Sequence, residues 1–220
     1  MHVVVNAAMS ADGKLSTHER QQIAISGESD FDRVDSMRAD SDAILVGVGT
    51  VLADDPALTV KDSGRVASRR SRGLDPQPTR IVADSQARTP ADTTVLDGEA
   101  KTIVLLGGHV KDTDLAKFDR EGVDTIIAGD ERVDLAEACR RLESRGIDRI
   151  MVEGGGELIF SLFKADLVEE LVVYVGPTII GGRDAPTLAD GDGFLDAFPE
   201  LQLQGVERID DGVLLEWNVI

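Results

Sequence analysis

The sequence has very little cysteine and histidine. Its 220 residues include one cysteine, Cys139, and three histidines. A single cysteine excludes an intramolecular disulfide and a zinc site built from several cysteines. The histidines, at positions 2, 18 and 109, show no metal-ligand spacing, so we predict no metal site. Cys139 lies in a helical pattern and is interpreted as a small packed side chain, and a reducing cytoplasm is the expected location.

Basic residues are also scarce. The chain has 23 Lys+Arg against 41 Asp+Glu, which gives a formal net charge of −18. A field of this sign repels phosphate backbones and anionic membranes, which argues against nucleic acid and membrane surfaces as partners. The acids are scattered through the chain, which indicates an acidic surface of the kind that keeps proteins soluble in high salt. No apolar run is long enough to span a bilayer, and we expect no signal segment.

The rest of the composition is that of a globular protein, with 42% hydrophobic residues and a length that fits one domain, residues 1–220. Strands and helices alternate along the middle of the chain, which predicts an α/β fold with a mostly parallel central sheet flanked by helices. Three successive strands near the end predict an antiparallel C-terminal edge, with a hairpin at Asp210-Asp211-Gly212. The expected strands cover 2–8, 43–48, 79–83, 102–106, 123–128, 149–152, 170–175, 201–208 and 213–219.

Helices are expected to begin near residues 29, 112, 134 and 158. Ser29 is interpreted as the N-cap of the first of them, because apolar residues follow it at helical spacing. The polar segment 61–78, rich in arginine and serine, is interpreted as a long exposed loop.

The stretch VEGGGE, residues 152–157, places three glycines between a strand and a helix. Glycines let a ligand approach the backbone closely, and the start of a helix offers free N–H groups to a phosphate. The plainer interpretation is a tight turn, but three glycines exceed what a turn needs, so we favour ligand binding. Glu153 ends the strand, where open α/β sheets bind ligands, although a solvated acid is the commoner role for such a residue.

A second buried strand enters a glycine turn in GVGTVLADDP, residues 47–56. Thr50 is predicted to N-cap a short helix, with Asp54 one turn later, and a capped helix without further function is the plainer interpretation. Arg38 ends the first helix. In so acidic a protein it would be a valuable phosphate ligand inside a pocket, although surface arginines are usually solvated. Asp12-Gly13 is read as an ordinary turn.

Five stretches together resemble the reductase family of riboflavin biosynthesis, which includes stand-alone archaeal and fungal enzymes and the C-terminal domain of a bifunctional bacterial enzyme. They occur in order across nearly the whole chain, and the block beginning at Gly47 is the most specific. The stretches are NAAMSADGKL (6–15), MRADSDAILVGVGTVLADDPALTV (37–60), TRIVADS (79–85), IMVEGGGEL (150–158) and VGPTIIGGRDAPT (175–187).

The resemblance implies a fold like dihydrofolate reductase and hydride transfer from NADPH, with NADH left open. It implies a phosphorylated pyrimidine substrate whose ribosylamino group is reduced to a ribitylamino group. It also implies a homodimer, for which the strand-rich C-terminal region would offer a sheet edge. No catalytic acid or base is assigned. The residues matched to cofactor contacts are Ala8, Thr50, Asp54, Ser85, Gly154, Gly155, Gly156 and Glu157, and those matched to substrate contacts are Arg38, Leu58 and Glu153.

The chain departs from the family pattern at a few positions. Gln22 and Ala24 stand near a serine and a cofactor-contacting tryptophan of the bacterial enzyme, so those roles are not transferred. Lys61 stands where arginine is common, which leaves its phosphate contact open. The zinc signature of the deaminase half is missing, so we expect reduction without deamination. Two alternatives remain open, namely a dihydrofolate-type pteridine reductase and a nucleotide-binding module without turnover.

Overall fold

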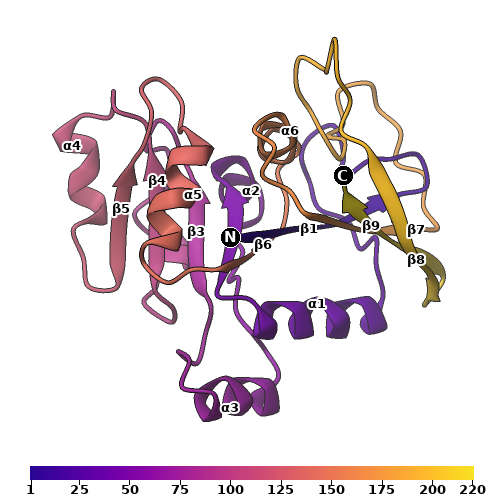
Figure 1. Ribbon diagram of the computed structural model, residues 1–220, viewed down its shortest axis with the longest axis horizontal. Helices are drawn as coiled ribbons and strands as arrows, with labels where there is room; N and C mark the ends of the chain where they lie inside the picture. The colour runs from indigo at the N-terminus through magenta and orange to yellow at the C-terminus, as the bar shows by residue number, and fades with distance from the viewer. The chain divides into compact units, whose positions relative to one another are not determined.

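The computed structural model describes residues 1–220 and shows an α/β fold (Figure 1). Nine strands form a mixed, mostly parallel sheet in the order β5-β4-β3-β2-β6-β1-β7-β9-β8, which confirms the predicted sheet and its antiparallel C-terminal edge. The strands are β1 (His2–Ser10), β2 (Ala43–Gly47), β3 (Thr79–Ala83), β4 (Thr102–Leu106), β5 (Val123–Ile127), β6 (Arg149–Val152), β7 (Glu170–Gly176), β8 (Leu201–Ile209) and β9 (Gly212–Val219).

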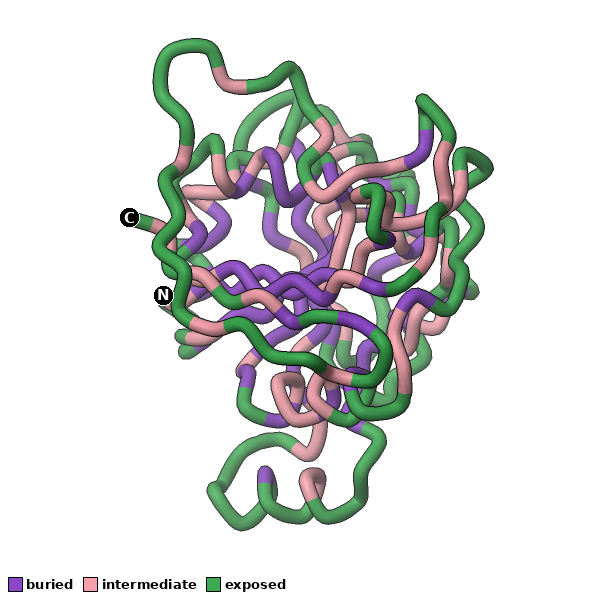
Figure 2. The backbone as a smooth tube through the Cα atoms, turned by 90° about the vertical axis from the view of Figure 1, so that its right-hand side faces the viewer, coloured by how far each residue is buried: buried purple, intermediate pink, exposed green.

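The helices and short 3-10 turns lie between these strands, and Figure 2 shows which stretches of the chain are buried and which are exposed. The chain divides into two compact units. The first is Met1 with Asp35–Met151, and the second is His2–Val34 with Val152–Ile220. The helices are α1 (Glu28–Asp40), α2 (Val48–Asp54), α3 (Ser63–Ser71), α4 (Asp112–Leu115), α5 (Leu135–Glu143) and α6 (Gly156–Lys164), with 3-10 turns η1 (Thr94–Leu96) and η2 (Ala116–Phe118).

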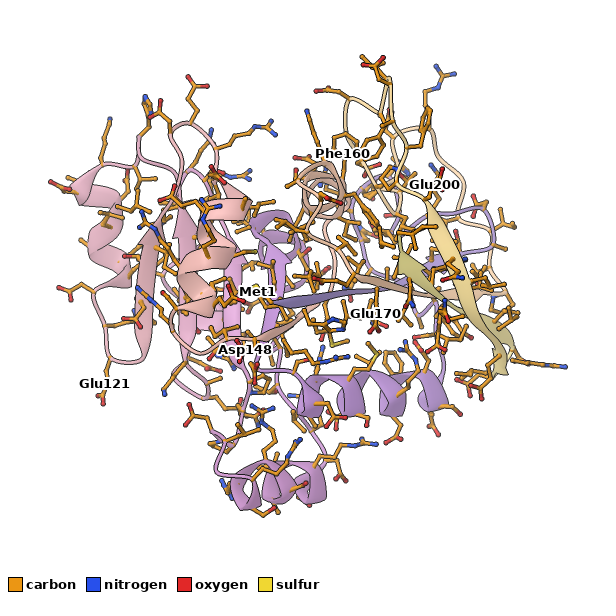
Figure 3. The ribbon with its side chains drawn as sticks, in the orientation of Figure 1. Met1, Glu121, Asp148, Phe160, Glu170 and Glu200 are labelled. Carbon is orange, nitrogen blue, oxygen red and sulfur yellow. The ribbon has the colours of Figure 1, made fainter.

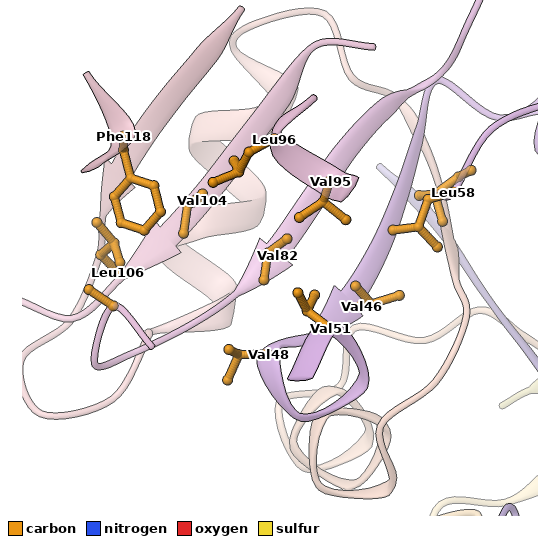
Figure 4. Packing of buried hydrophobic residues seen from close by; sticks show 12 residues of the cluster. Val46, Val48, Val51, Leu58, Val82, Val95, Leu96, Val104, Leu106 and Phe118 are labelled. Carbon is orange, nitrogen blue, oxygen red and sulfur yellow. The ribbon is translucent and has the colours of Figure 1, made fainter. Parts of the chain in front are cut away.

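In the first unit, β2, β3, β4 and β5 are parallel neighbours. Their side chains alternate between the two faces of the sheet, so every second residue enters the same core. That core contains Val46 from β2, Val82 from β3 and Val104 from β4, closed by Val48 and Val51 of α2 (Figure 4). Burying aliphatic side chains of this size stabilises the fold by about 1.5–3 kcal/mol each.

The helix predicted to begin at Asp112 is divided into α4 and η2. The tighter 3-10 turn brings residues three apart onto one side. Leu115 and Phe118 have this spacing, and both pack against the core of the first unit. The packing of Phe118, which is 3% exposed, therefore accounts for the change of helix type.

The segment 61–78 is not the exposed loop that its composition predicts, because it contains helix α3. Asp62 caps this helix by accepting a hydrogen bond from the N–H of Arg65. Arg69 is 2% exposed, and its guanidinium donates to the carbonyl oxygens of Ala39, Ser41 and Asp75. A buried arginine that satisfies three carbonyl oxygens fixes the helix in place, which a count of polar residues does not reveal.

In the second unit, β1 pairs in parallel with β7, and β7 pairs in an antiparallel manner with β9. β8 and β9 form the predicted hairpin, with Asp210 in the left-handed conformation at its turn (φ +51°). Most residues of β8 are exposed, since this strand ends the sheet.

Helix α1 begins at Glu28, one residue earlier than expected, so Ser29 lies inside the first turn and is not its N-cap. Two of the three buried positions of this helix are carboxylates, and the third is Ala39. Phe31 is 59% exposed, whereas Asp30 and Asp35 are 1% and 7% exposed. Each of these carboxylates binds arginine, Arg33 for Asp30 and Arg65 for Asp35. Paired charges therefore replace the apolar face that the spacing predicted.

Candidate functional site

Two of the predicted cofactor residues, Thr50 and Asp54, lie on α2, which follows the carboxyl end of β2 directly. They are four residues apart, so they lie on the same face of the helix, and both are half-buried. Thr50 is not the N-cap as predicted. The cap is Gly47, in an extended conformation (φ −78°, ψ 152°), without a side-chain hydrogen bond. The hydroxyl of Thr50 therefore has no capping role in α2.

The carboxyl end of α2 is held by Asp55. Asp55 adopts the left-handed conformation (φ +41°), and its N–H donates to the carbonyl oxygen of Val51. Its carboxylate accepts hydrogen bonds from both hydroxyls of Thr93 and Thr94 and from the N–H of Thr94, and these bonds lower the pKa of Asp55. Asp54, the neighbouring residue, is thus carried on a helix whose last turn is anchored to another segment.

Ser85 follows β3, the parallel neighbour of β2, so it lies at the same carboxyl edge as α2. Its hydroxyl oxygen accepts a hydrogen bond from the N–H of Val133 at 3.0 Å, and its carbonyl oxygen accepts one from Gly107 at 3.2 Å. A Cβ atom at Gly107 would lie 2.5 Å from the carbonyl oxygen of Asp130 and 3.0 Å from that of Ser85, so the chain approaches Ser85 closely here because residue 107 is glycine. The first unit therefore brings Thr50, Asp54 and Ser85 to one edge of its sheet.

The predicted substrate residues of the first unit also come together. Nη1 of Arg38 donates to the carbonyl oxygen of Thr59 at 3.0 Å, which places the guanidinium beside Leu58. Leu58 is 2% exposed and holds a left-handed conformation (φ +50°). Lys61 is two residues further on, and its ammonium group donates to the hydroxyl of Thr59 at 2.9 Å.

Asp35 organises the same region. It lies on α1, three residues before Arg38, and accepts hydrogen bonds from the N–H groups of Lys61 and Asp62 and from Arg65. Burial opposes the charged form of Asp35, but these donors outweigh it and the pKa of the carboxyl group is lowered. An ionised Asp35 thus fixes the backbone on which Lys61 stands.

In the second unit, the glycine turn joins β6 to α6. Gly154 and Gly155 have positive φ angles of +124° and +91°, which other residues rarely adopt. Gly155 is the N-cap of α6, and no side chain caps the first N–H groups of the helix. These groups are suited to a phosphate, since they are donors at the positive end of the helix dipole. Glu153 is half-buried before the turn, and Glu157 is exposed after it.

Ala8 lies on β1 opposite Tyr174 of β7, near the carboxyl ends of both strands. The strand then enters the Asp12-Gly13 turn, which is more than an ordinary turn. The Asp12 carboxylate accepts hydrogen bonds from the Ser10 hydroxyl at 2.6 Å and from the N–H groups of Ile180 and Gly181 at 3.0 and 2.8 Å. The loop after β1 is thereby attached to the loop after β7.

The Asp12 contacts predict a specific titration. The Ser10 hydroxyl, then the Ile180 and Gly181 N–H groups, lower the pKa of Asp12 to about 2 from 3.8. Because the folded-state pKa lies below the unfolded value, the carboxylate stabilises the fold above pH 3.8, and this contribution is lost as the pH falls towards 2. Carbon-detected NMR of the side-chain carboxyl group should show this midpoint in the wild type and a higher one in Ser10→Ala. A midpoint at 3.8 in both proteins would show that Asp12 does not accept these hydrogen bonds in solution.

Sequence reasoning missed Asp12, Thr187 and Asp190. The stretch 175–187 carries part of the family resemblance, but the resemblance implies no ligand contact for its residues. No local pattern marks the long-range contacts of Asp12 and Asp190. The Asp12 carboxylate accepts from the N–H of Ile180, 168 residues away, and the N–H of Asp190 donates to the carbonyl oxygen of Gly156. The structure contains no group of three or more histidine, cysteine or acidic residues placed to hold a metal ion. None of its helices combines the length and apolar composition that a membrane crossing requires.

Candidate residues that follow the carboxyl ends of strands define a class of protein, the open α/β proteins that bind small ligands at this edge of the sheet. Comparison with known proteins defines the family. A family model described as the RibD C-terminal domain matches residues 1–215. The chain belongs to this family of reductases of riboflavin biosynthesis.

Relatives and solved structures agree with this assignment. The chain is 43% identical over 211 residues to the 2,5-diamino-6-ribosylamino-4(3H)-pyrimidinone 5′-phosphate reductase of Archaeoglobus fulgidus, covering 96% of this chain and 94% of that protein. It is 40% identical to the protein of the same name from Methanothermobacter thermautotrophicus, covering 99% and 98%. The crystal structure of a pyrimidine reductase-like protein from Corynebacterium diphtheriae has the same fold, with a TM-score of 0.86 at 20% identity and coverage of 100% and 92%.

Proposed function

We propose that the chain catalyses the NADPH-dependent reduction of the ribosylamino side chain of 2,5-diamino-6-ribosylamino-4(3H)-pyrimidinone 5′-phosphate to the ribitylamino form. The observation that carries this proposal is the match, over almost the full length of both chains, to two archaeal proteins that bear this reductase name. The chain is thus a pyrimidinone phosphate reductase of riboflavin biosynthesis.

The residues present fit a nicotinamide cofactor. Gly154 and Gly155 have positive φ angles and, as glycines, leave the backbone of the turn uncovered, and no side chain caps the first N–H groups of α6. We assign the phosphates of NADPH to this turn, and the remaining cofactor contacts to the residues that the family match indicates. When bound, the cofactor supplies the hydride. The assigned residues are Ala8, Thr50, Asp54, Ser85, Gly154, Gly155, Gly156 and Glu157.

The substrate is assigned to Arg38, Leu58 and Glu153. A guanidinium binds phosphate through two parallel hydrogen bonds, which suits Arg38 to the 5′-phosphate. The carboxylate of Glu153 accepts hydrogen bonds from hydroxyl or amino groups.

Opening of the ribosylamine ring gives an imine; hydride adds to its sugar carbon, and the nitrogen takes up a proton. The protein holds the two reactants in position, and needs no covalent nucleophile. The one cysteine, Cys139, is a buried side chain, with 8% of its surface exposed.

Asp54→Ala is expected to raise the KM for NADPH by about tenfold, the usual effect of losing a hydrogen bond to a charged group, with little change in thermal stability. The helix itself is anchored by Asp55 and capped by Gly47, so Asp54 is not needed for its fold. Leu52→Ala, on the same helix at a 49% exposed position, is the matched control. An unchanged KM in a stable Asp54→Ala protein would remove Asp54 from the cofactor site.

The activity is tested by following NADPH oxidation with the diamino substrate, its deaminated counterpart and dihydrofolate in parallel. We expect turnover with the diamino compound and none with dihydrofolate. Binding of NADPH without oxidation by any of the three would favour a nucleotide-binding module, and turnover of dihydrofolate would favour a pteridine reductase.

A homodimer is also part of the proposal. β8 is an edge strand, and it exposes Leu201, Leu203 and Val206, at 40%, 54% and 62%. An exposed strand edge with apolar side chains is a surface on which a second chain can pair. The single domain spanning residues 1–220, the cytoplasmic location and the adaptation of the acidic surface to salt stay predictions.

A further inference from the structure

Gly156 is a glycine for a different reason than its two neighbours. Its φ angle is not positive, and it is buried. A Cβ atom at this position would collide with the carbonyl oxygen of Thr187 and lie 2.7 Å from Oδ2 of Asp190. The turn formed by residues 187–190 therefore lies directly against the first residue of α6.

Asp190 holds this turn together and attaches it to the helix. Its carboxylate accepts hydrogen bonds from the N–H of Thr187, at 3.2 and 3.1 Å, and from the Thr187 hydroxyl. Its own N–H donates to the carbonyl oxygen of Gly156 at 3.0 Å. One residue thus closes the turn with its side chain and contacts the glycine segment with its backbone.

The contact is supported on the helix side by an aromatic pair. Phe160, labelled on α6 in Figure 3, lies 5.0 Å from Phe194 between ring centroids. A Cβ atom at Gly191 would collide with the Phe160 ring, so the chain after Asp190 runs directly over that ring. The turn cannot shift along α6 without losing both contacts.

Fixing the Gly156 carbonyl group has a consequence for the donors at the start of α6. The peptide unit between Gly156 and Glu157 is planar, so the direction of its C=O sets the direction of its N–H. The N–H of Glu157 is one of the first helical N–H groups, which have no partner within the helix. The hydrogen bond from Asp190 therefore also sets where this donor points.

We propose that Asp190 is a positioning residue for the cofactor, which orients the start of α6 without touching the cofactor itself. The proposal rests on the proposed function, in which this turn binds the phosphates of NADPH. An oriented donor binds a phosphate better than one that must be ordered on binding, because the ordering cost is already met in the free protein. Loss of Asp190 should thus weaken cofactor binding and leave the reaction of the bound cofactor unchanged.

The test is an equilibrium fluorescence titration with NADPH, without substrate, on Asp190→Ala, Asp190→Asn and Gly156→Ala. Asp190→Ala removes all three hydrogen bonds that its carboxylate accepts from Thr187, so the turn is no longer held closed, and Gly156→Ala displaces the turn. We expect the Kd for NADPH to rise by about tenfold in both. Asp190→Asn keeps one acceptor and should fall between these variants and the wild type. At saturating NADPH, kcat and the KM for substrate should stay within about twofold of the wild type in the two Asp190 variants, since Asp190 contacts neither the substrate nor the cofactor.

Asp42→Asn is the matched control. Asp42 accepts from the N–H groups of Asp148 and Arg149 at 2.9 and 2.8 Å, at the amino end of β6 rather than its carboxyl end. It should lower the melting temperature without changing the Kd. If Asp190→Ala and Asp190→Asn also lower only the melting temperature, or bind NADPH more tightly, the positioning role is wrong. If Gly155→Val likewise leaves the Kd unchanged, the cofactor site itself is wrong, and not only the role of Asp190.

Discussion

Replacing Gly155 with valine is expected to weaken NADPH binding by about a hundredfold. Gly155 caps α6 with φ +91° and ψ +95°, a conformation that a β-branched residue adopts only with strain. The turn must then rotate away from its present path, and the first N–H groups of α6 rotate with it. A valine side chain also covers backbone that the phosphates are expected to approach. The measurement is the Kd from a fluorescence titration with NADPH, together with a thermal melt.

Gly122→Val is the control for strain alone. Gly122 also has a positive φ, +79°, and has open space around the position of a Cβ atom. It precedes β5, at the amino end of the strand and away from the candidate residues. This variant should lose thermal stability and keep its NADPH affinity. A folded Gly155→Val protein with wild-type affinity would show that the glycine turn does not hold the cofactor.

Arg38→Lys and Glu153→Gln are expected to lower kcat/KM for the pyrimidine substrate by about ten- to a hundredfold, and to leave NADPH affinity nearly unchanged. Lysine keeps the charge of Arg38 but loses its planar pair of donors, so phosphate recognition suffers even though the electrostatic attraction remains. Glutamine keeps the size of Glu153 and loses its charge. A steady-state series in substrate, beside an NADPH titration, separates the two ligands.

Arg72→Lys is the matched control for Arg38→Lys. Arg72 is an arginine of the same unit whose guanidinium donates to the carbonyl oxygen of Ala39 and to Asp40, and the family match gives it no ligand. Arg72→Lys should change neither kcat/KM for the pyrimidine substrate nor the affinity for NADPH. Loss of NADPH binding in Arg38→Lys or Glu153→Gln, with unaltered dependence on substrate, would mean that the substrate and cofactor assignments are reversed.

Most strands were predictable from the sequence because they are short apolar runs between turn residues, and β8 was predictable from the hairpin signal at Asp210-Asp211-Gly212. The helices were less predictable where contacts between distant residues determine their structure. The α3 segment reads as a loop, since its residues are polar and its stability depends on Arg69 reaching carbonyl oxygens of Ala39 and Ser41. In α1 two of the three buried positions are Asp30 and Asp35, which only their arginine partners explain. Pairing between distant charges leaves no periodic pattern in the sequence.

The candidate site divides in the same way. Its location was predictable, because the carboxyl ends of parallel strands meet at one edge, and the structure brings Thr50, Asp54 and Ser85 there. The reason why each residue is needed at its position was less predictable. Gly156 is required by the turn that contains Asp190, and this requirement follows from a contact across more than thirty residues of chain. Individual assignments to cofactor and substrate remain predictions that the variants above test.

The central claim is that hydride passes from the nicotinamide ring to the sugar carbon of the ribosylamino group. It is tested most directly by supplying NADPH that carries deuterium at the transferred position and locating the label in the product by mass spectrometry and NMR. The account predicts one deuterium in the product, on the sugar carbon bonded to the side-chain nitrogen. A reduced product without the label there, or oxidation of the cofactor without a ribitylamino product, would contradict it.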